Sequence, residues 1–196
     1  MGALDKFKGF KDAVLRPIIV LLKFLRVTPD IITWTGFLIN IAAAYFIVKG
    51  RFITAGAVII AAGLFDMLDG MLARELNIKS KFGGFLDSAV DRLSEGALYL
   101  GIIIHYTYIS PYPKAVIAAY CVMFLSFLVS YLRARAGGLK IDCETGIFTR
   151  TERIIVLIIA LMADVLFYAM ILIGVLSFIT VVQRFLHVKK KTEQKQ

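Results

Sequence analysis

The sequence predicts an all-α integral membrane protein with six transmembrane helices and an N-terminal juxtamembrane amphipathic helix. Hydrophobic residues make up 59% of its 196 residues, compared with about 45–50% in soluble domains. They gather into segments of about 20 residues, the length that an α-helix needs to cross a bilayer. Lys and Arg concentrate between alternate segments, which is typical of proteins that cross a membrane several times.

Residues 1–28 are predicted to form a cytoplasmic interfacial amphipathic helix. Basic residues such as Lys6, Lys11 and Lys23 are interleaved there with apolar residues. This pattern places one helix face among lipid headgroups and the other among acyl chains, so membrane lipids are expected partners. Pro29 ends the helix, because a proline disfavours helical geometry in the residue before it.

The six transmembrane helices are expected within residues 29–188. Their predicted ranges are 31–49, 52–74, 83–106, 112–135 and a helical hairpin over 152–187 that bends near residues 162–164. Residues 189–196 are expected to form a polar tail. This arrangement leaves no room for a second, soluble domain.

The net charge of +9 reports membrane orientation, and no nucleic-acid partner is predicted. Outside the helices, Lys and Arg concentrate in the N-terminal segment, the 74–82 loop, the 133–153 segment and the C-terminal tail. Lys49, Arg51 and Lys114 belong to the opposite side. Because positively charged loops stay in the cytoplasm, we expect a multi-pass protein of the cell membrane with both termini and the active site on the cytoplasmic side.

Four aspartates are the most informative polar residues of this apolar chain. Asp66 and Asp69 lie three residues apart near the end of the second predicted helix, and Asp87 and Asp91 lie four apart near the start of the third. Each pair therefore shares one helix face. A hairpin of the two helices brings the pairs to a similar depth just below the cytoplasmic surface.

Carboxylates at such a depth are costly unless they meet a partner, an ion or a wet cavity. Hard oxygen ligands suit Mg²⁺ or Mn²⁺, and four carboxylates match two ions that clamp a phosphoryl group. Two alternatives remain. The aspartates could pair with Arg74 and Arg92 as buried salt bridges, or they could line the pathway of a non-enzymatic cation transporter. The second is disfavoured because the acids cluster at one end of the helices.

The pattern D-x-x-D-G-x-x-A-R-x8-G-x3-D-x3-D is matched at every specified position between Asp66 and Asp91. It resembles the signature of the CDP-alcohol phosphotransferase family, also called the CDP-alcohol phosphatidyltransferase family. The resemblance implies transfer of a phosphate-linked group from a CDP-activated donor to an alcohol, with release of CMP. It implies that Asp66, Asp69 and Asp87 hold two metal ions, and that Asp91 completes the second site and accepts the proton of the attacking hydroxyl.

The same resemblance implies a CDP-lipid pocket. Its expected residues are Pro29, Asp30, Gly70, Ala73, Arg74 and Ser80. The small residues would leave room for the nucleotide, and the guanidinium group would contact phosphate. Pro29 and Asp30 could instead form a plain turn and helix cap, and Ser80 could be an ordinary polar loop residue.

The acceptor is suggested by arginines near the cytoplasmic ends of later helices. Arg133, Arg135 and Arg153 could bind an anionic acceptor phosphate, or they could only set topology. The runs S-Y-L-R-A-R-A and D-S-A-V-D-R-L-S-E-G are similar to those of the phosphatidylinositol phosphate and archaetidylinositol phosphate synthase branch. This similarity implies CDP-diacylglycerol or CDP-archaeol as donor, inositol 1-phosphate as acceptor and a homodimer.

One position departs from the pattern of this branch. Thr151 stands where that branch is expected to have proline. The alternative is a phosphatidylglycerophosphate synthase that uses glycerol 3-phosphate, although Ser88 and Arg92 stand where such enzymes more often have proline and lysine.

Overall fold

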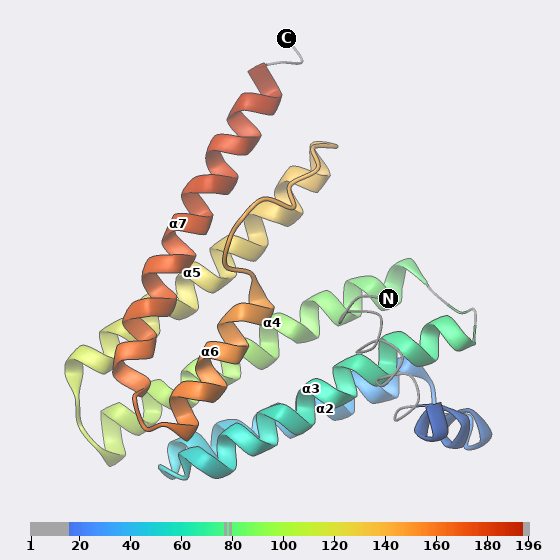
Figure 1. Cartoon of the computed structure of the whole chain (residues 1–196), viewed down its shortest axis with the longest axis horizontal. Coiled ribbons are helices and arrows are strands. Elements are labelled where there is room, and N and C mark those ends of the chain that lie inside the picture. Colours follow the sequence, from blue (N-terminus) through green and yellow to red (C-terminus); the bar gives the residue numbers. More distant parts are fainter. Residues whose placement is uncertain (1–15, 77, 79, 194–196) are drawn as a thin grey trace, which may run out of the picture. The chain divides into compact units, whose positions relative to one another are not determined.

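The computed structural model describes residues 16–76, 78 and 80–193, and every regular element among them is helical. A short helix covers residues 16–24. It is followed by α2 (Pro29–Val48), α3 (Phe52–Glu75), α4 (Lys81–Ile104), the π-helical segment η1 (His105–Ile109), α5 (Pro113–Gly138), α6 (Arg150–Met162) and α7 (Leu166–Glu193) (Figure 1). The expected all-α class is confirmed.

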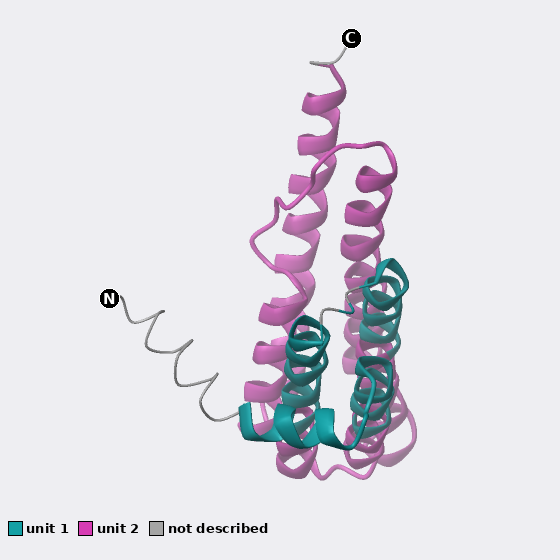
Figure 2. Cartoon of the chain, turned by 90° about the vertical axis from the view of Figure 1, so that its right-hand side faces the viewer, with its two compact units in different colours: residues 1–39, 60–93 teal, residues 40–59, 94–196 magenta. Residues whose placement is uncertain are grey.

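The chain divides into two compact units, which Figure 2 shows in different colours. Unit 1 comprises residues 1–39 and 60–93, and unit 2 comprises residues 40–59 and 94–196. Helices α2, α3 and α4 each contribute a segment to both units. The first half of α2, the second half of α3 and the first half of α4 therefore belong together in unit 1.

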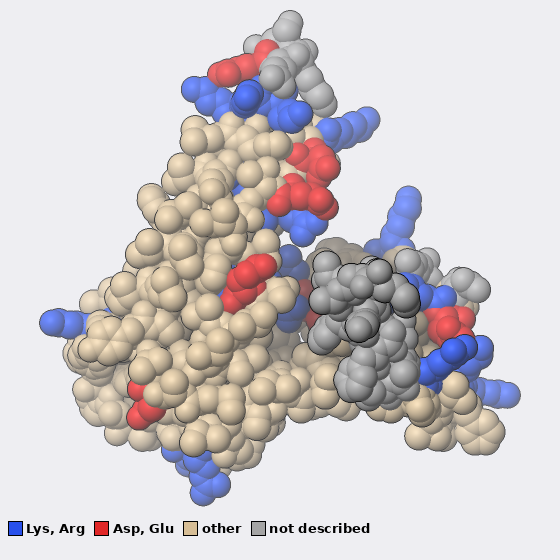
Figure 3. Space-filling view, in the orientation of Figure 1, with Lys and Arg blue, Asp and Glu red and all other residues tan. Residues whose placement is uncertain are grey.

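Four helices of the described chain, α2, α3, α5 and α7, are long and apolar enough to cross a membrane. The chain is thus a multi-pass membrane protein. On the face seen in Figure 3, the surface over the middle of α7 is mostly uncharged, whereas charged side chains gather near its C-terminal end, where α7 carries Lys189, Lys190, Lys191 and Glu193. This distribution matches a helix whose middle meets lipid and whose end meets water.

The last predicted hairpin occurs, but its two helices are unequal. A capping box at Thr149 and Glu152 starts α6 at Arg150, because it satisfies amide groups that the first helical turn leaves free. Asp164 has a positive φ of 55° and separates α6, of 13 residues, from α7, of 28 residues. The break lies where the sequence indicated, and the early stop makes α6 the shorter partner.

Residues 16–24 of the predicted amphipathic segment are helical, with one buried side and one exposed side. Ile19 is buried against Ile32, Leu68 and Leu72 in one apolar cluster of unit 1. Phe24, on another side, is 83% exposed, as expected for a face that meets lipid. Residues 1–15 of the predicted helix lie outside the described residues.

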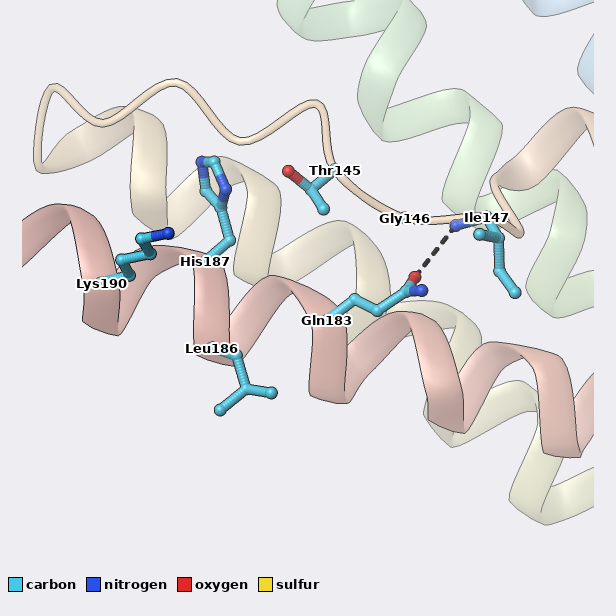
Figure 4. Close-up of a pocket in the computed structure, with 7 residues that line it drawn as sticks. All are labelled: Thr145, Gly146, Ile147, Gln183, Leu186, His187 and Lys190. Carbon is cyan, nitrogen blue, oxygen red and sulfur yellow. Dashed lines mark hydrogen bonds between the residues drawn. The ribbon is translucent and has the colours of Figure 1, made fainter.

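The 139–149 loop of unit 2 is tied to α7. Gln183 Oε1 accepts a hydrogen bond from the amide of Ile147 at 3.1 Å (Figure 4), and Thr180 Oγ1 accepts one from the amide of Phe148 at 3.1 Å. The Arg184 guanidinium donates from Nε to the carbonyl of Thr145 at 2.9 Å. The loop therefore delivers the chain to the start of α6 in a fixed conformation.

A close backbone approach in unit 2 generates a stability prediction. A Cβ added at Gly101 of α4 would lie 2.9 Å from the carbonyl oxygen of Ala44 in α2. We expect Gly101→Ala to lower the free energy of unfolding by about 1–3 kcal/mol, because the backbone must shift to relieve the contact. Unfolding in detergent micelles measures this change.

The matched control is Gly63→Ala, where an added Cβ meets nothing within 4 Å. That variant should be neutral or more stable by up to about 1 kcal/mol, because alanine favours helix over glycine. Equal stability of the two variants would contradict close packing at Gly101.

Candidate metal and nucleotide site

Three of the four predicted metal ligands come together in unit 1. Carboxylate oxygens of Asp66 and Asp69 on α3 and of Asp87 on α4 all lie within 4.8 Å of one another. Asp69 is buried, and the other two are exposed. Three hard, anionic oxygen donors at this spacing fit a divalent cation such as Mg²⁺ or Mn²⁺.

Thr33 of α2 holds the buried member of this cluster. Its hydroxyl lies 2.7 Å from Asp69 Oδ2, to which it donates a hydrogen bond, and 3.1 Å from the carbonyl oxygen of Pro29. Thr33 was not among the site residues predicted from the sequence. The sequence could have indicated it by position, because Thr33 lies three residues after Asp30 and therefore about one turn further along the same helix.

A cavity of about 560 Å³ in unit 1 surrounds the carboxylate cluster. Its lining includes Pro29, Asp30, Asp66, Asp69, Gly70, Ala73, Ser80, Asp87 and Asp91. These residues come from the starts of α2 and α4 and the end of α3. The structure thus brings together nearly all residues that the sequence assigned to metal and nucleotide.

Glycines make part of this cavity accessible. Gly70 and Gly84 both line it, and a Cβ added at either position would meet nothing within 4 Å. The space beside these backbones is therefore free for a ligand that approaches closely. Ser80 has a second role, because its Oγ accepts a hydrogen bond from the amide of Gly83 at 2.8 Å and so caps the start of α4.

Asp91 and Arg74 differ from the other predicted residues. Asp91 lines the cavity but lies outside the set of three carboxylates, and its Oδ2 is 3.5 Å from Nη1 of Arg92. Arg74 is not among the lining residues, because its Nε donates to the carbonyl of Gly70 at 2.9 Å in its own helix. A phosphate contact from Arg74 would require its side chain to swing away from α3.

The arginines predicted for the acceptor lie in unit 2 and have different surroundings. Arg135 is exposed in the last turn of α5. Arg133 is also exposed, and its Nη2 lies 3.5 Å from Oε1 of Glu144. Arg153 is fully buried and paired with Glu95. The sequence predicted that Arg153 faces an incoming anion, and it gave no sign of this partner.

Arg184 is a further arginine that the sequence did not single out. It is 3% exposed, and it donates hydrogen bonds to the carbonyl groups of Thr145 and Val129. It therefore links α7 to α5 and to the loop that precedes α6. No local spacing marks it, since its partners lie 39 and 55 residues away in sequence.

The contact between Thr33 and Asp69 generates a prediction for metal binding. Thr33→Val keeps the shape of the side chain but removes the hydroxyl that orients the carboxylate. We expect Mn²⁺ affinity, measured by electron paramagnetic resonance titration, to fall about 10- to 100-fold, as is usual when a ligand loses its supporting hydrogen bond.

Thr35→Val is the control. The Thr35 hydroxyl donates only to the carbonyl of Ile31 in its own helix among the described contacts, at 2.7 Å, so Mn²⁺ affinity should not change. Equal affinities for wild type and Thr33→Val would show that Asp69 needs no support from α2.

Comparison with known proteins agrees with this geometry. A family model described as CDP-alcohol phosphatidyltransferase matches residues 26–184. The archaetidylinositol phosphate synthase of Methanothermobacter thermautotrophicus is 35% identical over 185 residues, which cover 91% of this chain and 92% of the relative. The phosphatidylinositol phosphate synthase of Cutibacterium acnes is 30% identical over 159 residues, with coverages of 81% and 77%.

The fold is similar to that of a solved relative. The crystal structure of Mycobacterium tuberculosis phosphatidylinositol phosphate synthase with CDP-DAG bound has a TM-score of 0.84 and 31% identity, covering 88% of this chain and 92% of that one. The same enzyme in complex with manganese and citrate also has a TM-score of 0.84, at 31% identity, with coverages of 88% and 87%. The chain therefore belongs to the CDP-alcohol phosphatidyltransferase family and is an enzyme of that class.

Proposed function

We propose that this enzyme makes a phospholipid by transferring a phosphatidyl or archaetidyl group from a CDP-activated lipid to inositol 1-phosphate. The observation that carries the proposal is the cluster of Asp66, Asp69 and Asp87 inside a cavity of about 560 Å³. The relatives named above support the choice of acceptor, since they are an archaetidylinositol phosphate synthase and a phosphatidylinositol phosphate synthase at 35% and 30% identity.

The donor's diphosphate would lie at the carboxylate cluster. Asp66, Asp69 and Asp87, together with Asp91, would hold two Mg²⁺ ions, or Mn²⁺ in their place. When bound, these ions would neutralise the charge of the diphosphate and of the departing CMP. Thr33 keeps the buried Asp69 oriented for this role.

The cytidine end of the donor would occupy the rest of the cavity. Pro29, Asp30 and Ser80 line one part of it, and Gly70 and Ala73 line another. The open space beside Gly70 lets the nucleotide approach the α3 backbone closely. Arg74 would contact phosphate after it releases the carbonyl of Gly70.

The chemical step needs a base for the attacking hydroxyl. We assign this role to Asp91, a cavity-lining carboxylate on the same helix as Asp87. The acceptor oxygen would form a bond to the lipid-linked phosphorus, and the bond from that phosphorus to the CMP oxygen would break. Asp91 would take the hydroxyl proton, and CMP would leave as an anion.

The acceptor's phosphate would bind to guanidinium groups at the end of α5. Arg133 and Arg135 lie in its last turns and are exposed. Guanidinium groups bind phosphate in a bidentate manner. The exposed Glu144 near Arg133 would be displaced by a more highly charged phosphate.

In the membrane, α4 and α6 would complete a six-helix domain with both chain ends in the cytoplasm. At 24 residues, α4 is about 36 Å long and long enough to cross. At 13 residues, α6 is about 20 Å long and would traverse only part of the ~30 Å hydrocarbon core. The active end would face the cytoplasm, and the enzyme would act as a homodimer.

Substrate use can be tested with purified protein in liposomes that contain CDP-diacylglycerol or CDP-archaeol. We expect CMP release that requires both Mg²⁺ and inositol 1-phosphate, with no release from free inositol. Release with glycerol 3-phosphate alone would keep the family chemistry and overturn the proposed acceptor. No release with any phosphorylated or free alcohol would overturn the activity.

The base is tested by Asp91→Asn. We expect turnover to fall at least about 100-fold, the lower end of what a general base contributes, while CDP-lipid still binds. The control is Asp164→Asn, which should leave turnover unchanged. Asp164 is exposed and lies in the α6–α7 turn at φ 55°, a backbone conformation that asparagine tolerates. Normal turnover of the Asp91 variant would remove Asp91 from this role.

A further inference from the structure

Glu95 and Arg153 form a buried ion pair in unit 2. Arg153 Nε donates to Glu95 Oε1 at 2.7 Å, and Nη2 donates to Oε2 at 2.9 Å. Both side chains are almost completely buried, at 3% and 0% exposure. Two parallel hydrogen bonds between a planar guanidinium and a carboxylate fix distance and orientation together. The pair therefore locks α6 to α4 in one geometry.

The surroundings of the pair are polar but incompletely satisfied. The hydroxyl of Tyr99 donates to Glu95 Oε1 at 3.4 Å. Arg153 Nη1 and the hydroxyl of the buried Ser126 have no hydrogen-bond partner among the residues that the structure describes. Unsatisfied buried groups lower stability, and a buried ion pair is weak evidence for stability in general. Stability alone does not account for these residues.

The pair fixes the start of α6, which carries a further arginine, Arg150. Arg153 lies three residues after Arg150, so both belong to one face of the first turn of α6. The Thr149–Glu152 capping box sets where that turn begins, with the amide of Thr149 donating to Glu152 Oε2 at 2.7 Å. The turn is thus held from both sides, by the cap and by the ion pair.

We propose that Glu95 and Arg153 are positioning residues for the acceptor. Through their ion pair, α4 holds the first turn of α6, so that Arg150 and the loop before it keep the geometry that an acceptor phosphate needs. This inference rests on the proposed function. It also changes the role of Arg153, which would not bind the acceptor phosphate itself but would hold Arg150 in place to do so. Acceptor binding should depend on the pair, whereas metal and nucleotide binding in unit 1 should not.

The first test uses Glu95→Gln, which keeps the size of the side chain and removes its charge. We expect the KM for inositol 1-phosphate to rise about 10-fold or more, because misplacing a binding group by about 1 Å can cost about 100-fold. The KM for CDP-lipid and the affinity for Mn²⁺ should stay within about twofold. Glu193→Gln breaks the exposed Lys189–Glu193 pair and should change neither KM.

A second variant separates positioning from stability. Glu95→Leu combined with Arg153→Met replaces the pair by apolar groups, a change that often leaves buried sites stable. We expect thermal stability and Mn²⁺ affinity to remain close to those of the wild type while the acceptor KM stays raised. A normal acceptor KM in this double variant would overturn the proposal. The proposal would also be overturned if, in the single variants, the KM for the acceptor, the KM for CDP-lipid and the thermal stability all changed together.

Wild-type controls distinguish this failure from failure of the proposed function. If the wild type releases CMP only with another phosphorylated alcohol, the acceptor assignment fails, and the same comparison of KM values is made with that alcohol. If none of the tested acceptors causes the wild type to release CMP, both the proposed function and this inference are overturned. An active wild type whose acceptor KM is insensitive to Glu95→Gln overturns the positioning role alone.

Discussion

Like-charge repulsion among Asp66, Asp69 and Asp87 is the constraint on which unit 1 depends. Their oxygens lie within 4.8 Å of one another. Each pair of unit charges at about 4 Å costs about 1 kcal/mol in bulk water and about 4 kcal/mol near a protein surface. Apolar packing of Ile19 and Leu72 joins α3, which carries Asp66 and Asp69, to α2 and the helix 16–24. A bound divalent cation would convert the same closeness into attraction.

The two units divide the chemistry between them. Unit 1 gathers acids in a cavity that suits cations and a nucleotide diphosphate. Unit 2 carries Arg133 and Arg135 near the end of α5 and Arg150 at the start of α6, the region that we propose for the acceptor phosphate. Helices α2, α3 and α4 each contribute a segment to both units. Under the proposed function, we expect separate sets of mutations to disturb donor binding and acceptor binding.

The sequence predicted what local spacing determines. Aspartates three and four residues apart share a helix face, so helix periodicity grouped Asp66 with Asp69 and Asp87 with Asp91. The predicted hairpin then brought the two pairs together. Long-range partners could not be found in this way. Arginine is usually exposed, so the sequence gave no reason to expect Arg153 to be buried. Its burial is explained by Glu95, its partner 58 positions away in sequence. Thr33 was not predicted as a site residue for the same reason, because its hydrogen-bond partner Asp69 lies 36 positions away in sequence.

Helix α4 shows why spacing alone does not assign a role to a carboxylate. Asp87, Asp91 and Glu95 follow one another at four-residue intervals on that helix, so the pattern treats them as equivalent. Their partners separate them. Asp87 joins two other carboxylates, an arrangement that needs added positive charge. Glu95 meets Arg153 in a bidentate pair, so its charge is balanced within the protein. Asp87, among other acids, is therefore available to a metal ion, whereas Glu95, neutralised by a buried bidentate arginine, organises structure.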